Sequence, residues 1–157
     1  MKTNDHPFDN IFPDYLRDRR TRNLIEQHSE IMFALGLLGA RASRNFKPAE
    51  SMVGPLEKIA RHATLMLAML GVEDPLALYT EEFEAAKVKH PGHTFDLPEV
   101  SNASKYWALA EEAGEVAAAM TYDNSQDTGH QADLIKEVTQ VGALALAWVT
   151  LYQNGEE

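Results

Sequence analysis

The chain has 157 residues, 45% of them apolar and 24% charged, which predicts a single globular domain with a sizeable core and excludes a largely disordered protein. It contains no cysteine, so disulfides, thiolate zinc sites and cysteine nucleophiles are excluded. The 24 acidic residues outnumber the 14 basic ones and give a formal charge of −10, so a nucleic-acid backbone is not an expected partner.

The N-terminal half predicts an irregular arm followed by two helices. Residues 1–13 are polar or aromatic, include two prolines and show no helical periodicity. From residue 14 apolar residues recur at helical spacing, and a second helix is predicted over about 48–70, where Gly71 suits the C-terminal cap. The apolar faces of these helices are formed by Leu24, Ile31, Leu35 and Leu38, and by Met52, Leu56, Ile59, Ala63, Met66 and Leu70. We therefore expect an N-terminal helical pair, residues 14–71, that packs on the core.

The remaining residues, 72–157, predict three more helices, over about 75–89, 102–122 and 130–153. Asp74 followed by a proline suits the start of the first, and the polar segment 123–129 has the length of a helix hairpin turn. The core faces of the last two helices are formed by Tyr106, Leu109, Ala113, Val116 and Met120, and by Leu134, Val138, Val141, Leu144, Trp148 and Leu151. No stretch alternates apolar and polar residues. The predicted fold is an all-α bundle of about five helices, the last two forming an antiparallel hairpin.

No segment predicts a membrane span or a signal peptide. The longest apolar stretches, 31–40, 63–72 and 141–152, are shorter than the roughly 20 residues that a membrane helix needs. The first residues of the chain are polar and lack the apolar core of a secretory signal. We expect a cytoplasmic protein without a membrane partner.

Four polar residues of the last two predicted helices suggest a cation site. Glu112 and Glu115 are three residues apart on one helix and therefore share a face, as do Glu137 and Gln140 on the next. Glutamate pairs at this spacing are usually solvated, but small apolar residues surround the first pair. An antiparallel hairpin brings Glu137 towards that pair, and like charges in such a setting destabilise the bundle unless a cation lies between them. The pattern therefore favours a hard divalent ion such as Mg²⁺.

The same residues resemble a known family. Glu-Glu-Ala-Gly-Glu at 111–115 and, after a step of 22 residues (137 − 115), Glu-Val-Thr-Gln at 137–140 are similar to the signature of the MazG-like all-α nucleoside triphosphate pyrophosphohydrolases. That signature is Glu-x-x-Glu, a hairpin and then Glu-x-x-Asp, and its four acids hold Mg²⁺. The resemblance covers about residues 80–153, and Gln140 stands where the family has its fourth acid. It marks residues 72–157 as a MazG-like helical region and does not account for residues 1–71.

The resemblance implies an enzyme that uses Mg²⁺, or Mn²⁺ in its place, to convert a nucleoside triphosphate to a monophosphate and pyrophosphate. Glu112, Glu115 and Glu137 would hold the cation with Gln140 as a weaker partner, and Glu111 or Glu112 would accept the proton of the attacking water. Gln140 brings no charge, which leaves an alternative open. In that alternative the protein is catalytically weak or inactive and binds nucleotides or serves assembly through the same fold.

Three lysines within or beside this region, Lys89, Lys105 and Lys136, are candidates for contact with a triphosphate. His90 and His93 have no acidic or thiolate partner at zinc spacing, so we expect them to be loop-surface residues. The methionines among apolar neighbours, Met32, Met66, Met69 and Met120, are expected to fill the core.

A homodimer is the expected assembly. The apolar residues of five helices are more than one small bundle is expected to hide, and the family that the chain resembles pairs helix hairpins between chains. The predicted N-terminal pair, 14–71, could instead cover the second face of the hairpin within one chain.

Overall fold

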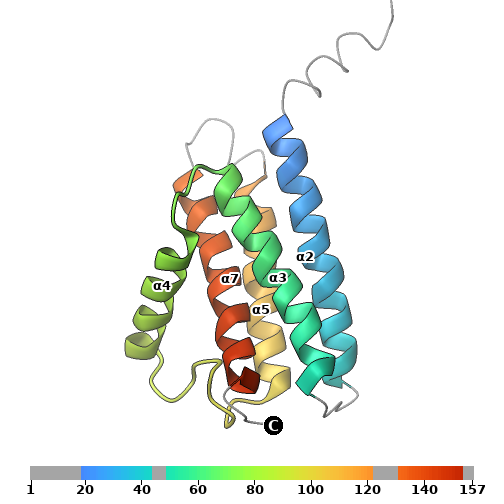
Figure 1. Cartoon of the computed structure of the whole chain (residues 1–157), viewed down its shortest axis with the longest axis vertical. Helices are drawn as coiled ribbons and strands as arrows, with labels where there is room; N and C mark the ends of the chain where they lie inside the picture. The colour runs from blue at the N-terminus through green and yellow to red at the C-terminus, as the bar shows by residue number, and fades with distance from the viewer. Residues whose placement is uncertain (1–18, 44–48, 122–130, 154–157) are drawn as a thin grey trace, which may run out of the picture.

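The computed structural model describes residues 19–43, 49–121 and 131–153, and these residues form helices and no strand. The helices are α2 (Arg19–Ser43), α3 (Ala49–Met69), α4 (Pro75–Lys89), α5 (Asn102–Ala119) and α7 (Gln131–Gln153) (Figure 1). The predicted all-α bundle is thus confirmed. The predicted arm at 1–13 and the polar turn at 123–129 lie outside the described residues.

Four of the helices form a ring in which each contacts two neighbours. α2 packs against α3 and α5, and α7 packs against the same two helices from the other side. Neighbouring helices in this ring run in opposite directions, and α4 lies outside it, against α7 (Figure 1). The N-terminal pair α2–α3 therefore covers the α5–α7 hairpin within one chain, which is the arrangement of an up-and-down four-helix bundle.

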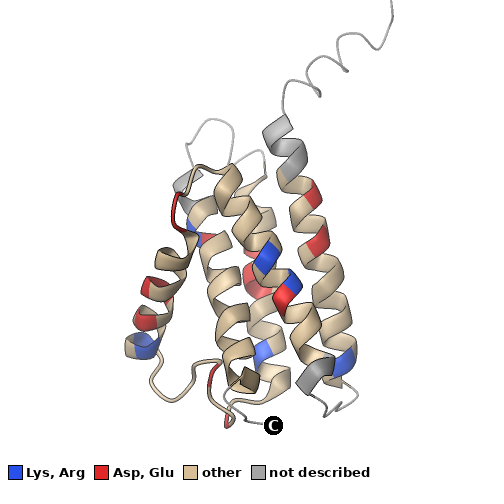
Figure 2. Ribbon diagram, in the orientation of Figure 1, with Lys and Arg blue, Asp and Glu red and all other residues tan. Residues whose placement is uncertain are grey.

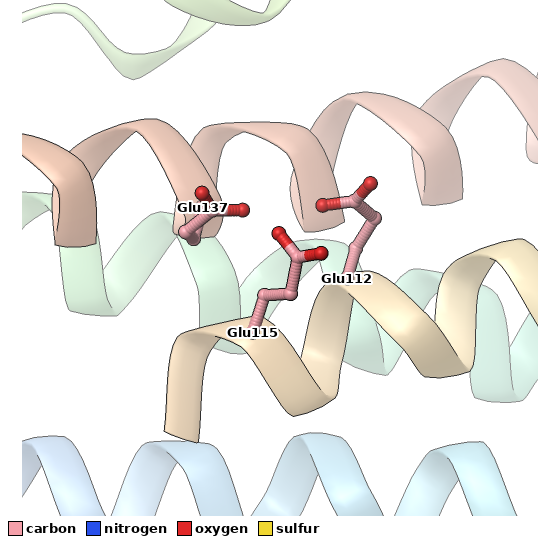
Figure 3. Close-up of side chains that lie close together, drawn as sticks. All are labelled: Glu112, Glu115 and Glu137. Carbon is pink, nitrogen blue, oxygen red and sulfur yellow. The ribbon is translucent and has the colours of Figure 1, made fainter. Parts of the chain in front are cut away.

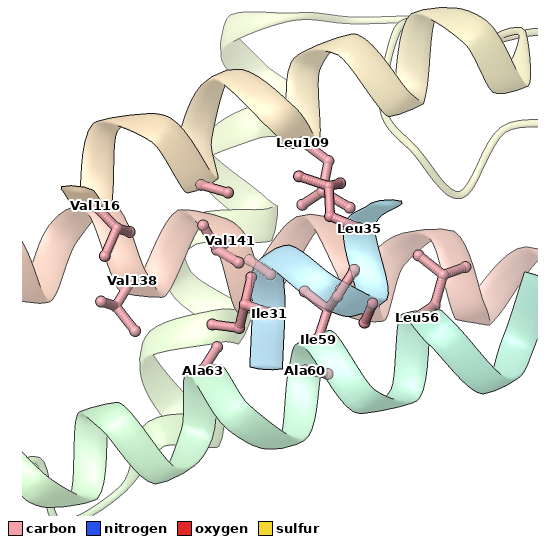
Figure 4. Close-up of a cluster of buried hydrophobic side chains, with 14 of the residues drawn as sticks. Ile31, Leu35, Leu56, Ile59, Ala60, Ala63, Leu109, Val116, Val138 and Val141 are labelled. Atoms are coloured by element: carbon pink, nitrogen blue, oxygen red, sulfur yellow. The ribbon is translucent and has the colours of Figure 1, made fainter. Parts of the chain in front are cut away.

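The core lies at the centre of the ring, where apolar side chains from all four helices meet (Figure 4). The buried positions include the full predicted faces of α2 and α3 and most of those of α5 and α7. Tyr106, Met120 and Leu144 are only partly buried and pack against the edge of this core. Because a fully buried aliphatic side chain contributes about 1.5–3 kcal/mol, the common core is what holds the ring together.

Local side-chain and backbone hydrogen bonds fix the ends of the helices. The Asp74 carboxylate accepts a hydrogen bond from the Ala77 amide at 3.2 Å, and the Ser101 hydroxyl accepts one from the Ser104 amide at 3.1 Å. These two residues are the N-caps of α4 and α5. Gly71 follows the end of α3, and its φ of +88° closes the C-terminal turn as predicted.

Two glycines let aromatic rings pack directly on helix backbones. The ring of Tyr79 in α4 lies against Gly142 of α7, where a Cβ atom would overlap it. The hydroxyl of Tyr79 also forms a 2.9 Å hydrogen bond with the Thr64 hydroxyl of α3. Tyr106 of α5 packs in the same way on Gly39 of α2. The first contact fixes α4 against α7, and the second fixes α5 against α2.

The outward face of α2 is apolar along its middle. Phe33 is 73% exposed, and Met32 and Leu37 are more than 40% exposed. The prediction that Met32 fills the core is wrong, because Ile31 and the neighbouring core positions of the same helix take the inward face. No charged residue lies between Glu30 and Arg41, so this stretch of α2 carries neither colour in Figure 2.

α7 is the one described helix whose length and composition would allow it to cross a membrane. The segment concerned is Leu134–Gln153, and 61% of the window tested is buried inside the bundle. Such burial is what the central helix of a bundle shows, since α7 contacts α3, α4 and α5.

Candidate metal centre and the adjoining cavity

Three glutamates from two helices converge at the edge of the α5–α7 interface. Glu112 and Glu115 project from successive turns of α5, and Glu137 projects towards them from α7 (Figure 3). One carboxylate oxygen of each lies within 4.8 Å of the others. The predicted approach of Glu137 to the first two across the hairpin is therefore present in the structure.

The core positions next to these glutamates set their register. Ala113 and Val116 of α5 and Val138 and Val141 of α7 are buried between the helices (Figure 4). Burying this apolar stripe leaves the adjacent positions on each helix at the rim of the interface, where Glu112 and Glu137 are half-buried and Glu115 is exposed. The carboxylates face one another because the two helices are locked by their apolar sides.

Gln140 lies beside the three glutamates and binds two of them. With its amide nitrogen turned towards the carboxylates, it donates hydrogen bonds to Oε2 of Glu112 at 2.7 Å and to Oε2 of Glu137 at 2.9 Å. The amide thus bridges the two helices at the position predicted for a fourth, weaker partner. Its nitrogen supplies neutral donors to the cluster, and its oxygen is the atom that could ligate a cation.

The carboxyl groups are difficult to ionise together. Burial, together with the negative charges of Glu115 and Glu137, raises the pKa of Glu112 to about 7. Burial also raises the pKa of Glu137, and its hydrogen bond with Glu115 acts in the same direction. Within the described residues, no lysine or arginine forms an ion pair with any of the three.

This donor set fits a hard divalent cation. Carboxylate and amide oxygens are the ligands that Mg²⁺ and Mn²⁺ take, and three of these oxygens already lie close together. A divalent ion would also remove the electrostatic conflict that raises the pKa of Glu112, because an opposite charge favours the ionised carboxylate. We therefore regard Glu112, Glu115 and Glu137 as a candidate metal centre.

A cavity of about 380 Å³ adjoins the candidate centre. Glu112 and Gln140 belong to its wall, so the cavity meets the glutamate cluster at one glutamate and at the amide beside it. The rest of the wall comes from α4, from α7, from Ala108 of α5 and from the pocket loop, which we define as residues 90–101 between α4 and α5. Its apolar part consists of Phe83, Ala85, Ala86, Phe95, Ala108, Ala143, Leu144 and Ala147. Its polar part is completed by Glu82, Lys89, His90, His93 and Thr94.

The structure separates the other predicted site residues. Of the three lysines, only Lys89 lies in the cavity wall. Lys136 is exposed on α7 beside Glu137, where its charge works against the raised pKa of that glutamate. Lys105 is fully buried and is not part of the cavity wall. Glu111 is exposed next to the cluster and is also absent from the wall.

Several cavity residues were not predicted as site residues. His90 and His93 are exposed, as expected for a loop surface, but both also line the cavity. Phe83 and Phe95 supply its aromatic surface. The proline-rich composition of the pocket loop marks an irregular segment, but nothing in it indicates which side chains turn towards α7.

Comparison with family models, with curated proteins and with solved structures finds no match to this chain.

Proposed function

We propose that this protein is a Mg²⁺-dependent nucleoside triphosphate pyrophosphohydrolase, which converts a nucleoside triphosphate and water to a monophosphate and pyrophosphate. The single observation that carries this proposal is the cluster of three carboxylates, one of which, that of Glu112, also lines a cavity of about 380 Å³. The resemblance of segments 111–115 and 137–140 to the MazG-like signature supplies the substrate class. A cavity of this volume, whose wall combines apolar and aromatic side chains with polar ones, is within the size range of small-ligand sites.

Glu112, Glu115 and Glu137 would hold the cation, which when bound polarises phosphoryl oxygens and lowers the pKa of water. Glu112 faces both the cluster and the cavity, so it is better placed than Glu111 to accept the proton of the attacking water. Lys89 offers the phosphates a positive charge in the cavity wall. The aromatic and alanine surfaces would exclude water and hold the nucleoside.

A second candidate function is nucleotide binding without turnover, and Gln140 is the observation that favours it. A neutral amide stands where the resembled family has a fourth acid, and in this structure its nitrogen is bonded to Glu112 and Glu137. Three carboxylates attract divalent ions less strongly than four. The site would therefore bind a cation more weakly, or bind one cation rather than two. A protein of this kind could act as a nucleotide sensor or as an assembly protein.

The test is a pyrophosphate-release assay over a panel of nucleoside triphosphates, with and without Mg²⁺. We expect the natural chain to release pyrophosphate in a Mg²⁺-dependent manner. The rate of release should fall by about 100-fold or more in the Glu115→Gln variant and should be unchanged in Glu81→Gln. Glu81 is the matched control because it is exposed on α4 and lies outside both the cluster and the cavity wall. A rise in melting temperature with nucleotide but no pyrophosphate would favour the second function, and neither response would contradict both.

A further inference from the structure

Lys105 is the most unusual charged residue in the described part of the chain. Its side chain is fully buried, and its Nζ atom has no hydrogen-bond partner among the described residues. A buried ammonium group without a partner is strongly destabilising, because it gives up its hydration and receives no equivalent bond in return. Such a group is therefore close to losing its proton.

The surroundings of Lys105 come from α7 and from the pocket loop. Its Nζ lies 5.8 Å from the ring centre of Trp148, whose indole nitrogen donates a 3.2 Å hydrogen bond to the Tyr152 hydroxyl. Burial lowers the pKa of Lys105 to about 8, and the carboxylates of Asp96 and Glu99 in the loop oppose that effect. Among the described residues, no charge on α2, α3, α5 or α7 acts on it appreciably.

Other residues of the same loop form part of the cavity wall. Phe95, which lines the cavity, meets the edge of Trp148 with ring centres 5.9 Å apart. Thr94, which also lines it, donates a 2.6 Å hydrogen bond from its hydroxyl to Asp96. The indole of Trp148 therefore lies beside both Lys105 and Phe95. The carboxylate of Asp96 both attracts Lys105 and accepts the hydrogen bond from Thr94.

We propose that Lys105 is a proton-operated latch that ties the pocket loop to the α5–α7 hairpin. When Lys105 is charged, its ammonium group attracts the carboxylates of Asp96 and Glu99, and this attraction keeps Phe95 packed against Trp148. When Lys105 is neutral, that attraction is lost and the loop is held by its apolar contacts alone. The cavity wall formed by Thr94 and Phe95 is then less firmly held, so the cavity responds to pH in the mildly alkaline range. This inference does not depend on the proposed function.

Trp148 provides a direct reporter for this latch. The chain has two tryptophans, and the other, Trp107, is 69% exposed, so a Trp107→Phe background leaves one indole beside Lys105. We expect its fluorescence to titrate with a midpoint near pH 8. The transition should be absent in Lys105→Met and retained in Lys58→Met, an exposed lysine of α3. Tyr152 does not interfere, because burial raises its pKa above the ordinary value of about 10.

Two further measurements address the loop and the case in which Lys105→Met does not fold. Amide exchange over residues 94–100, corrected for its intrinsic pH dependence, should speed up as the pH rises through the fluorescence midpoint. In Asp96→Asn the midpoint should move to lower pH, because a carboxylate that stabilises the ammonium has been removed. A flat fluorescence profile between about pH 6.5 and about pH 9.5, or an unchanged midpoint in Asp96→Asn, would overturn the proposal.

Discussion

The surroundings of Glu112 disfavour the ionised form of its carboxyl group. Its folded-state pKa of about 7 lies above the value of about 4.3 expected in an unfolded chain. The folded protein therefore binds more protons than the unfolded one between these two values. The stability that this group contributes is fully present below about pH 4.3 and is lost as the pH rises through 7.

The first prediction follows from this decrease in stability with rising pH. Without divalent ions, the free energy of unfolding should fall by about 1–2 kcal/mol between about pH 5 and about pH 8, after allowance for solvent screening. Denaturant melts at fixed ionic strength would measure this loss. Millimolar Mg²⁺ or Mn²⁺ should restore the stability at the higher pH, because the cation favours the ionised carboxylates. A Glu112→Gln protein that keeps the full pH slope would contradict the assignment to Glu112.

A second prediction concerns Gln140. The Gln140→Glu substitution replaces the amide, which donates hydrogen bonds to Glu112 and Glu137, with a fourth carboxylate at the same place. The metal-free protein should lose about 1–3 kcal/mol of stability, while its affinity for Mn²⁺ should rise severalfold. Calorimetric titration with Mn²⁺ measures the affinity. Gln140→Met, which removes the donors without adding charge, should lose stability without gaining affinity, and equal affinity in the two variants would count against a cation at this position.

At the residue scale, the sequence predicts the glutamate cluster better than the lysines. Spacing alone places Glu112 and Glu115 on one face, and the hairpin brings Glu137 to them, because a helix repeat and an antiparallel turn are local properties of the chain. Lys105 is different. It occupies a core position one turn before Leu109, and its burial depends on how the pocket loop closes over the end of the bundle. That closure involves residues with no periodic pattern.

At the scale of single elements, α4 shows how one backbone contact positions a helix. Tyr79 is the one fully buried side chain of α4, and its ring rests on Gly142. The hydrophobic pattern of α4 is weak, so this contact and the hydrogen bond to Thr64 decide where the helix lies. Because α4 carries one wall of the cavity, the glycine shapes the candidate site from a distance.

The third prediction tests that contact with a pair of matched substitutions. Gly142→Ala should destabilise the protein by about 1–3 kcal/mol, because a Cβ there overlaps the Tyr79 ring. Gly36→Ala on α2 should instead stabilise it by about 0.5–1 kcal/mol, because a Cβ there meets nothing within 4 Å and alanine favours the helix. Thermal or denaturant unfolding measures both. Similar effects of the two changes would mean that α4 does not depend on this contact.

The helices themselves could be predicted closely, whereas the cavity could not. The 3.6-residue repeat of apolar residues predicts the core faces. The capping residues Asp74, Ser101 and Gly71 indicate where the helices begin and end, and both signals are local in the sequence. The cavity arises where the pocket loop and α4 meet α7. Residues such as His93 and Phe95 enter it through tertiary packing, for which the sequence contains no repeating signal.

At the scale of the whole molecule, the α2–α3 pair already closes the core within one chain, so a homodimer would have to use another surface. The apolar middle of α2 is the best candidate, because residues 31–40 contain no charge and Phe33 is 73% exposed. Glu30 precedes this stretch and Arg41 follows it. An antiparallel pairing of two α2 helices would bring these opposite charges together. The homodimer stays a prediction.

Light scattering at tens of micromolar tests this fourth prediction. The natural chain should have twice the 17.5 kDa mass of one chain, and Phe33→Lys should return it to a single chain. Val88→Lys is the matched control, since Val88 is 85% exposed on α4, away from α2, and should leave the mass unchanged. The three exposed apolar side chains of the patch, Met32, Phe33 and Leu37, supply only part of the roughly 1,200–2,000 Å² that stable interfaces bury, so dissociation on dilution is expected. A monomer at all concentrations would refute the pairing.

The position of α7 in the ring has a consequence for how the protein is made. α7 is the last of the described helices to leave the ribosome, yet it contacts α3, α4 and α5 and carries the buried Trp148. Until it emerges, α3 and α5 lack the partner that lies between them, and α4 lacks its main packing partner. The nascent chain therefore exposes a long apolar surface until α7 has emerged, and chaperones that hold such surfaces would be needed most during that interval.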